Sequence, residues 1–176
     1  DGKIVSRVTA RGGAVDTDNP DERSWSSGIV AVTADRVRMR AEVVVDGLER
    51  PTDLVFTPDR RLIVSERAGR IRIVRDGHLL PDAAVSIAES LGANGSLLAL
   101  AVDPQFDRNR HVFAIYTAPA RSGEPTFCLV RFREVSDTLG DPAVLLDGIP
   151  ASPAPRASLR FGADAKLYAA FDDGGD

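Results

Sequence analysis

The chain has 176 residues, 43% of them hydrophobic, and 22 basic against 26 acidic side chains give a formal net charge of −4. This is the length of one domain with a core of its own, and the acidic balance gives no electrostatic reason to expect a nucleic-acid partner. The single cysteine, Cys128, excludes an internal disulfide and, within an apolar run, is expected to be a buried small hydrophobe.

The N-terminal part predicts one strand and a long loop, followed by two more strands. Lys3 to Thr9 is the first strand, and an acidic, proline-containing loop follows it up to residue 28. Ile29 to Thr33 and Val37 to Val45 are rich in β-branched residues. This region lacks the pattern of a signal peptide, and the chain contains no apolar run of the roughly 20 residues that a spanning helix needs, so we expect a soluble protein without a membrane partner.

Residues 47–77 predict most of one antiparallel blade. Asp53 to Phe56, Leu62 to Glu66 and Arg70 to Val74 are short apolar strands, joined by two tight turns. In the last strand, alternation with a period of two places Ile71 and Ile73 on one face and the arginines on the other.

Residues 78–149 predict a weak strand and then a second, complete blade. The weak strand is Ala84 to Ile87, and the blade has four strands: Leu97 to Asp103, His111 to Thr117, Phe127 to Glu134 and Ala143 to Leu146. A proline-rich break at 149–155 then leads to two strands of a third unit, Leu159 to Gly162 and Leu167 to Phe171.

A repeated pattern of strand, Asp-containing turn and strand favours an all-β fold, a β-propeller with about three four-stranded blades. The expected divisions are a strand and loop over 1–28, a first blade over 29–90, a second over 91–149 and part of a third over 150–176. Phe56, Val102 and Phe161 occupy equivalent positions in the repeats and are predicted to be buried. The alternative is an ordinary β-sandwich.

Three segments resemble the glucose/sorbosone dehydrogenase family. They are GLERPTDLVFTPDRRLIVSERAGRIRIVRDG, SLLALAVDPQFDRNRHVFAIYTA and SLRFGADAKLYAAFDDGGD, which resemble the family's first, second and third blades. The resemblance implies a six-bladed propeller that oxidises sugars with pyrroloquinoline quinone (PQQ) and calcium, and a periplasmic or secreted location.

The order of the segments departs from the family. GKIVSRVTARGGAVDTDNP resembles the segment that follows DDGGD in the family, yet here it stands at the N-terminus, so the chain looks circularly permuted and about half of the family's length. Three open blades would leave two bare sheet edges. We therefore expect a homodimer in which residues 1–28 of one chain complete the third blade of its partner, giving a six-bladed ring.

The resemblance also assigns site residues, and most of them are changed. The family's catalytic histidine falls on Ala154 and its glycine pair on Arg156-Ala157, while a family glutamine falls on Gly95. A quinone-contacting arginine has no counterpart after Ser26-Ser27-Gly28, and Asp173 is the one surviving acid, next to Asp172 in place of a glycine.

The remaining candidate residues have plainer interpretations. His78 and His111 are expected at the surface, and Trp25 is expected to fold onto the blade, with stacking on a sugar as the alternative. Arg67, Arg70, Arg72 and Arg75 are expected to form a solvated face, with an anion-binding patch as the alternative. Two acidic clusters have no complete calcium-loop pattern and predict no metal site: Asp16, Asp18, Asn19 and Asp21, and Asp172, Asp173 and Asp176.

The sequence thus predicts a propeller that is related to PQQ-dependent sugar dehydrogenases, is catalytically degenerate and holds no cofactor. One alternative is a non-catalytic module that binds a carbohydrate or another protein, or an engineered or rearranged half-propeller. The second alternative is an active PQQ-dependent aldose dehydrogenase.

Overall fold

The computed structural model describes the backbone of residues 2–12, 29–32 and 37–172, and the side chains of residues 43–172. The chain divides into two compact units, Asp1–Gly47 and Leu48–Asp176. We call the second one the blade unit.

The first unit holds three strands in the order β1-β3-β2. They are β1 (Gly2–Gly12), β2 (Ile29–Val32) and β3 (Val37–Leu48), so the three predicted strands are confirmed. Their grouping differs from the expectation that residues 29–90 form the first blade. β3 is the central strand of this separate sheet and makes its ladder with β1 and β2, so the first blade begins at residue 51.

The first blade is an antiparallel sheet in the order β4-β5-β6-β7, with β8 also paired to β6. Its strands are β4 (Pro51–Phe56), β5 (Leu62–Glu66), β6 (Arg70–Arg75), β7 (His78–Leu79) and β8 (Val85–Ser86). The turn between β5 and β6 requires Gly69, because its φ is +98° and an added Cβ would lie 3.0 Å from the nitrogen of Ala88.

The second blade has four strands in the order β12-β11-β10-β9. These are β9 (Leu97–Val102), β10 (His111–Pro119), β11 (Pro125–Val135) and β12 (Thr138–Pro150), which confirms the four predicted strands. A short helix, α2 (Ala88–Leu91), precedes the blade, and α3 (Phe106–Asn109) connects β9 to β10.

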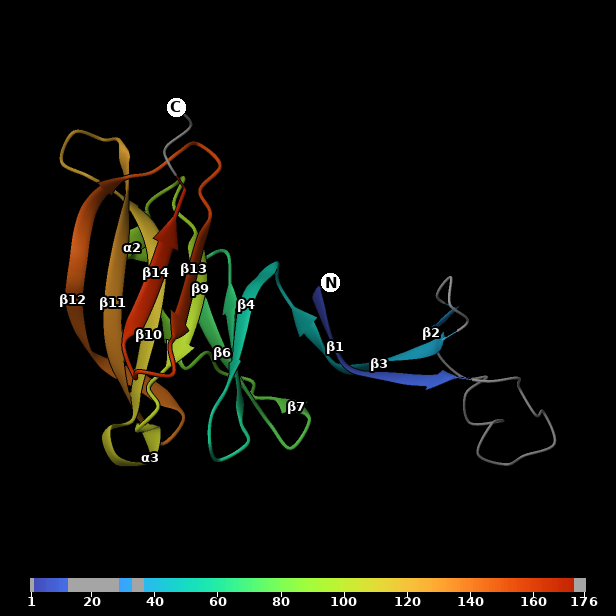
Figure 1. Ribbon diagram of the computed structural model, residues 1–176. Coiled ribbons are helices and arrows are strands. Elements are labelled where there is room, and N and C mark those ends of the chain that lie inside the picture. The colour runs from blue at the N-terminus through green and yellow to red at the C-terminus, as the bar shows by residue number, and fades with distance from the viewer. Residues whose placement is uncertain (1, 13–28, 33–36, 173–176) are drawn as a thin grey trace. The chain divides into compact units, whose positions relative to one another are not determined.

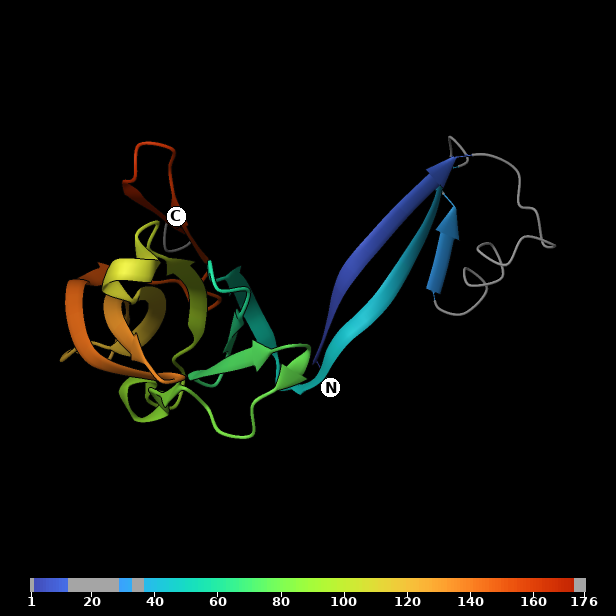
Figure 2. The same ribbon diagram turned by 90° about the horizontal axis from the view of Figure 1, so that it is seen from below.

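The third sheet is the predicted hairpin of β13 (Ala157–Phe161) and β14 (Leu167–Phe171). β9 lies between β4 and β13, so the first strands of the three sheets stand side by side (Figure 1). The outermost strand of the second blade, β12, lies at the far edge of the unit from β4 (Figure 2). This succession of antiparallel sheets confirms the all-β propeller architecture, here with two full blades and a two-stranded third sheet.

Two apolar cores hold neighbouring sheets together. The first core lies between the blades and includes Ile71 and Ile73, which confirms the predicted alternation, as well as Phe106 and the buried Cys128. The second core joins the second blade to the hairpin and includes Phe127 and Leu159.

The predicted burial of the three repeat positions is wrong for Phe56. Its side chain is 66% exposed, because Val55 packs against the first core and alternation turns Phe56 to the opposite face of the blade. Val102 and Phe161 are half-buried, packed against the first and second cores respectively.

Candidate functional site

Three connections gather at one end of the blade unit, which we call the loop end. They are the α2–β9 loop, the β10–β11 turn and the connection from β12 to β13, and they surround a cavity of about 650 Å³. The residues that line it are mainly small or rigid: Leu91, Ala93, Asn94, Gly95, Thr117, Ala118, Pro119, Gly123, Glu124, Pro125, Ala151, Ser152, Pro153 and Pro155.

Gly95 shapes the wall of this cavity. An added Cβ at this position would lie 2.2 Å from the carbonyl oxygen of Leu91 and 2.4 Å from that of Thr117, so this backbone has room for glycine alone. Ser96 fixes the loop, since its backbone N–H donates to Thr117 Oγ1 at 3.0 Å. The family's glutamine, which the resemblance aligns with Gly95, has no side chain to replace it at this position. The preceding residue, Asn94, brings a shorter carboxamide to the cavity.

Ala154, the position of the expected histidine, is exposed in the β12–β13 connection. Asp172 positions this connection. Its Oδ2 accepts hydrogen bonds from Ser152 Oγ at 2.9 Å and from the N–H of Arg156 at 2.8 Å. Sequence reasoning considered Asp172 as a replaced glycine and as a member of an acidic cluster, and missed this role, although a carboxylate directly after a strand was a visible signal.

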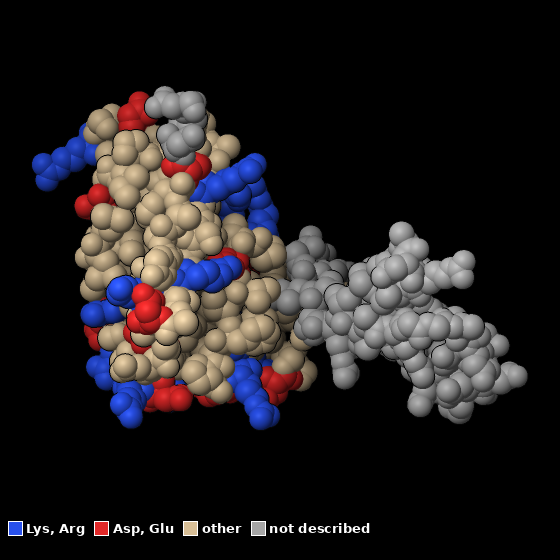
Figure 3. Space-filling view, viewed as in Figure 1, with Lys and Arg blue, Asp and Glu red and all other residues tan. Residues whose placement is uncertain are grey.

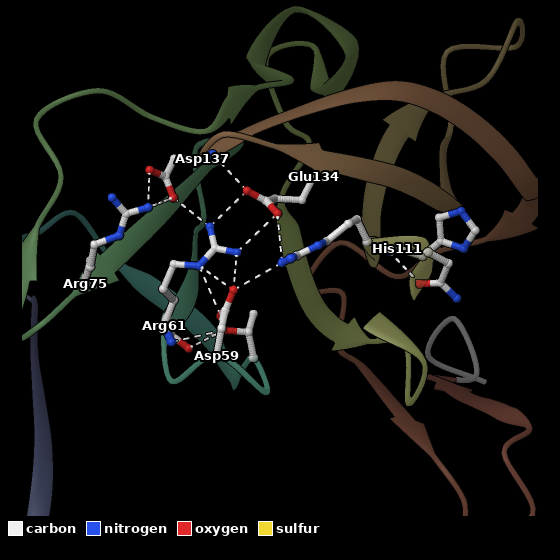
Figure 4. Close-up of polar contacts among 9 residues, drawn as sticks. Asp59, Arg61, Arg75, His111, Glu134 and Asp137 are labelled. Atoms are coloured by element: carbon white, nitrogen blue, oxygen red, sulfur yellow. Dashed lines mark hydrogen bonds and ion pairs between the residues drawn. The ribbon is translucent and has the colours of Figure 1, made fainter. Parts of the chain in front are cut away.

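The remaining site residues do not converge on the cavity. His111 begins β10 at the opposite end of the strand from the cavity, where burial and then the charge of Arg131 lower its pKa (Figure 4). His78 is exposed on β7, an outer strand of the first blade. Asp173, the surviving acid, lies outside the described residues, as do Trp25, Asp16, Asp18, Asn19, Asp21 and Asp176.

The predicted solvated arginine face on the first blade needs correction. Arg72 is only 9% exposed and donates to the carbonyl oxygen of Leu80 at 2.8 Å, because the β7–β8 segment folds against it. Arg70 forms ion pairs of 2.7 Å with both Glu66 and Glu49. Two of these arginines are therefore structural.

The opposite end of the unit, which we call the network end, carries a cluster of charges that joins the two blades. Arg61 of the first blade forms a two-point pair with Glu134 of β11, at 2.9 and 3.1 Å (Figure 4). Asp59 and Asp137 also accept from Arg61, at 2.8 and 2.6 Å, and Asp137 accepts from Arg75 as well. Sequence reasoning missed this network.

The network is buried at its centre and open at its rim. Arg61 is 7% exposed and Glu134 4%. The guanidinium of Arg61 lowers the pKa of both Glu134 and Asp59 below the usual range, and Glu134 in turn raises the pKa of Arg61. A concavity of about 600 Å³ adjoins the network and is lined by acidic and basic residues. Figure 3 shows acidic and basic side chains side by side at this lower edge of the blade unit. With its charges mutually compensated, the network end is an interblade contact.

The model of the glucose/sorbosone dehydrogenase family matches residues 48–176, which is the blade unit. An uncharacterized protein of Synechocystis is 36% identical over a region that covers 52% of this chain and 24% of that protein. Quinoprotein glucose dehydrogenase B of Acinetobacter calcoaceticus is 28% identical over 76% of this chain and 30% of its own length.

Solved structures show the same architecture. An oxidoreductase from Thermus thermophilus, described as a glucose dehydrogenase, has a TM-score of 0.64 at 34% identity and aligns over 75% of this chain and 39% of its own. The soluble aldose sugar dehydrogenase of Escherichia coli has a TM-score of 0.66 at 22% identity, over 77% of this chain and 41% of its own, and shows the fold alone. The chain thus spans well under half of the length of these relatives.

Proposed function

Because this chain belongs to the glucose/sorbosone dehydrogenase family, we propose that its blade unit keeps the family's propeller scaffold and binds a carbohydrate at the loop end without oxidising it. The observation that carries the proposal is Ala154, whose methyl group stands where the resemblance expects the proton acceptor. A periplasmic or secreted location belongs to the same proposal and rests on the resemblance alone. None of the helices among the described residues is long and apolar enough to cross a membrane.

The loop end does not fit the quinone-dependent reaction that the family implies. That reaction takes a proton from the sugar hydroxyl, and no histidine is among the described residues that line the cavity. Glu124 is the lining carboxylate, but it is exposed at the β10–β11 turn, and in the described structure no side chain orients it. General base catalysis needs a positioned acceptor, so we assign no catalytic step to this site.

The cavity instead offers what neutral binding requires. Its proline and alanine walls are rigid and apolar, while Asn94 and Ser152 place an amide and a hydroxyl around it. Pockets of a few hundred Å³ with a few polar groups are typical small-molecule sites. In the part of the chain that is described, no group of three His, Cys, Asp or Glu side chains could hold a metal ion.

Active PQQ-dependent aldose oxidation is the second candidate, and it is favoured by the similarity to a quinoprotein glucose dehydrogenase and to other glucose dehydrogenases. The two candidates differ in one measurement. We expect the 176-residue chain, supplied with PQQ, calcium and a dye acceptor, to oxidise glucose at no more than a small fraction of the rate of the E. coli aldose dehydrogenase, because a general base contributes about 10²- to 10⁴-fold. Turnover comparable to that enzyme would overturn the proposal.

Binding is tested separately. Glucose should bind the chain in a saturation-transfer NMR experiment, and Asn94→Ala should weaken the signal. Gln105→Ala, an exposed carboxamide near the network end, is the matched control and should change nothing.

We also propose that two chains associate through the outward faces of the blade unit. Leu54 and Phe56 on the first blade are 38% and 66% exposed, and Tyr168 on the hairpin is 56% exposed. The first blade and the hairpin stand on opposite sides of the second blade, so a two-fold arrangement would cover both apolar faces at once. Exchange of the N-terminal strand between the subunits is the mechanism that the permuted order suggests.

Light scattering tests this assembly. The intact chain should show the mass of two chains, and Phe56→Asp should show the mass of one. Val135→Asp places the same charge on a residue that is 60% exposed at the network end and should leave the dimer intact. A folded monomer in the unmodified chain would refute the assembly, and a chain lacking residues 1–10 that still dimerised would refute strand exchange.

A further inference from the structure

A second concavity, of about 320 Å³, adjoins the cavity at the loop end. It is lined by Arg50, Pro51, Thr52, Arg67, Leu98, Pro155, Arg156 and Ala157, and Pro155 also lines the larger cavity. Basic side chains are visible on this flank of the blade unit, beside its C-terminal end (Figure 3). Three of the eight lining residues are therefore arginines, in a wall that continues into the proposed carbohydrate site.

The backbone holds two of these arginines together. Arg50 stands just before β4 with a φ of +49°, and its carbonyl oxygen accepts a hydrogen bond from the N–H of Arg67 at 3.0 Å. The carbonyl oxygen of Arg67 accepts from the backbone N–H of Leu97 at 3.0 Å, and the side-chain Nη1 of Arg67 lies 3.4 Å from Ser96 Oγ. Both residues are thus fixed to the first strand of the second blade.

The third arginine comes from the hairpin. Arg156 stands just before β13. Its backbone N–H donates to Asp172 Oδ2 at 2.8 Å, and its carbonyl oxygen accepts from the backbone N–H of Asp172 at 3.1 Å. The three positions belong to different segments of the chain and open onto one concavity.

The charges of these arginines are not compensated by the described residues. Elsewhere in the blade unit Arg61, Arg70 and Arg160 all form ion pairs with carboxylates. Among the residues with described side chains, no carboxylate lies within ion-pair distance, 4.0 Å, of Arg50, Arg67 or Arg156. Like charges that share a concavity repel one another, and an anion bound between them removes that repulsion.

From this arrangement we infer that Arg50, Arg67 and Arg156 bind the acid group of a small ligand, a carboxylate or a phosphate. Guanidinium groups suit this role, because their N–H donors match the paired oxygens of such groups. The inference rests on the proposed function for the rest of the ligand: a sugar ring in the larger cavity would reach the arginines past Pro155. The ligand class is therefore an acidic monosaccharide, a sugar acid or a sugar phosphate.

Calorimetric titration of the whole chain at low salt tests the inference with glucuronate, glucose 6-phosphate, glucose and inorganic phosphate. Either acidic sugar should bind at least about tenfold more tightly than glucose, and which of the two binds more tightly identifies the acid group. Arg156→Gln and Arg67→Gln should each remove about tenfold of that affinity and leave glucose binding unchanged. Arg156 is exposed, so its replacement keeps the test valid if Arg67→Gln does not fold.

Arg108→Gln is the matched control, since it removes one exposed charge from α3 at the network end. Equal binding of glucose and both acidic sugars would overturn the arginine site while leaving the carbohydrate proposal in place. An equal loss in Arg108→Gln and Arg156→Gln would also overturn it, because the effect would then come from net charge. Tight binding of phosphate alone, without acidic sugars, would show an adventitious ion only and would contradict the inference.

Discussion

Replacing Arg61 by Met should lower the free energy of unfolding by about 5 kcal/mol, and replacing Glu134 by Gln by about 3 kcal/mol. Both side chains are buried, and breaking such a pair removes the closest counter-charge of the partner that remains, while Arg75 and Arg110 keep their own ion pairs at the rim. The loss is larger for Arg61→Met, because this change leaves Glu134, Asp59 and Asp137 facing one another. Urea unfolding at pH 7 measures both losses.

Lys166→Met is the control for this prediction. It also removes the cation of an ion pair, but Lys166 and Asp164 are 76% and 43% exposed, and water screens such pairs. The control should unfold at the same urea concentration as the unmodified chain. If it lost as much stability as Arg61→Met, burial would not explain the effect.

The same network predicts a dependence on pH. Asp59 and Glu134 have a pKa lower in the folded chain than in the unfolded chain, because Arg61 stabilises their charged forms. Their contribution is complete above the unfolded values of about 4 and is lost as the pH falls through the lower folded values. The stability difference between the unmodified chain and Arg61→Met should therefore narrow on acidification below about pH 4. A difference that stayed constant would contradict the assigned pairing.

Local patterns predicted the strands well, because alternation and turn residues act over a few positions. Ile71 and Ile73 follow the period of two into the first core, and Gly69 takes the positive φ that its turn demands. The Arg61–Glu134 pair joins residues 73 positions apart, and no local pattern carries that distance. Phe56 shows the same limit: the repeat revealed its strand, but the placement of neighbouring blades decides which face of a strand is covered.

For the candidate site, too, the sequence indicated some features and missed others. The resemblance points to the loop end through Ala154 and Gly95, since both lie in the connections that surround or border the cavity. It could not reveal what replaced the expected groups. The hydrogen bonds of Asp172 join residues 16 and 20 positions apart, and the concavity that Arg50 and Arg156 both line depends on how the first blade and the hairpin pack. Such contacts are fixed by packing of the cores, which the sequence pattern does not specify.

Truncating Phe127 to Ala should cost about 3 to 5 kcal/mol and should also release the β13–β14 hairpin. Phe127 is fully buried in the second core, with its ring 4.9 Å from that of Phe171 on β14. The hairpin pairs with no other strand of the described structure, so this core is its main attachment to the second blade.

Phe106→Ala is the matched control, because it removes an equally buried ring from the first core. Hydrogen exchange should distinguish the two variants. Amides of residues 157–171 should exchange faster in Phe127→Ala than global unfolding accounts for, whereas in Phe106→Ala they should follow global stability. Since Arg156 adjoins β13, Phe127→Ala should also weaken acidic-sugar binding more than Phe106→Ala does. Equal exchange in both variants would mean that the hairpin is held by contacts other than the second core.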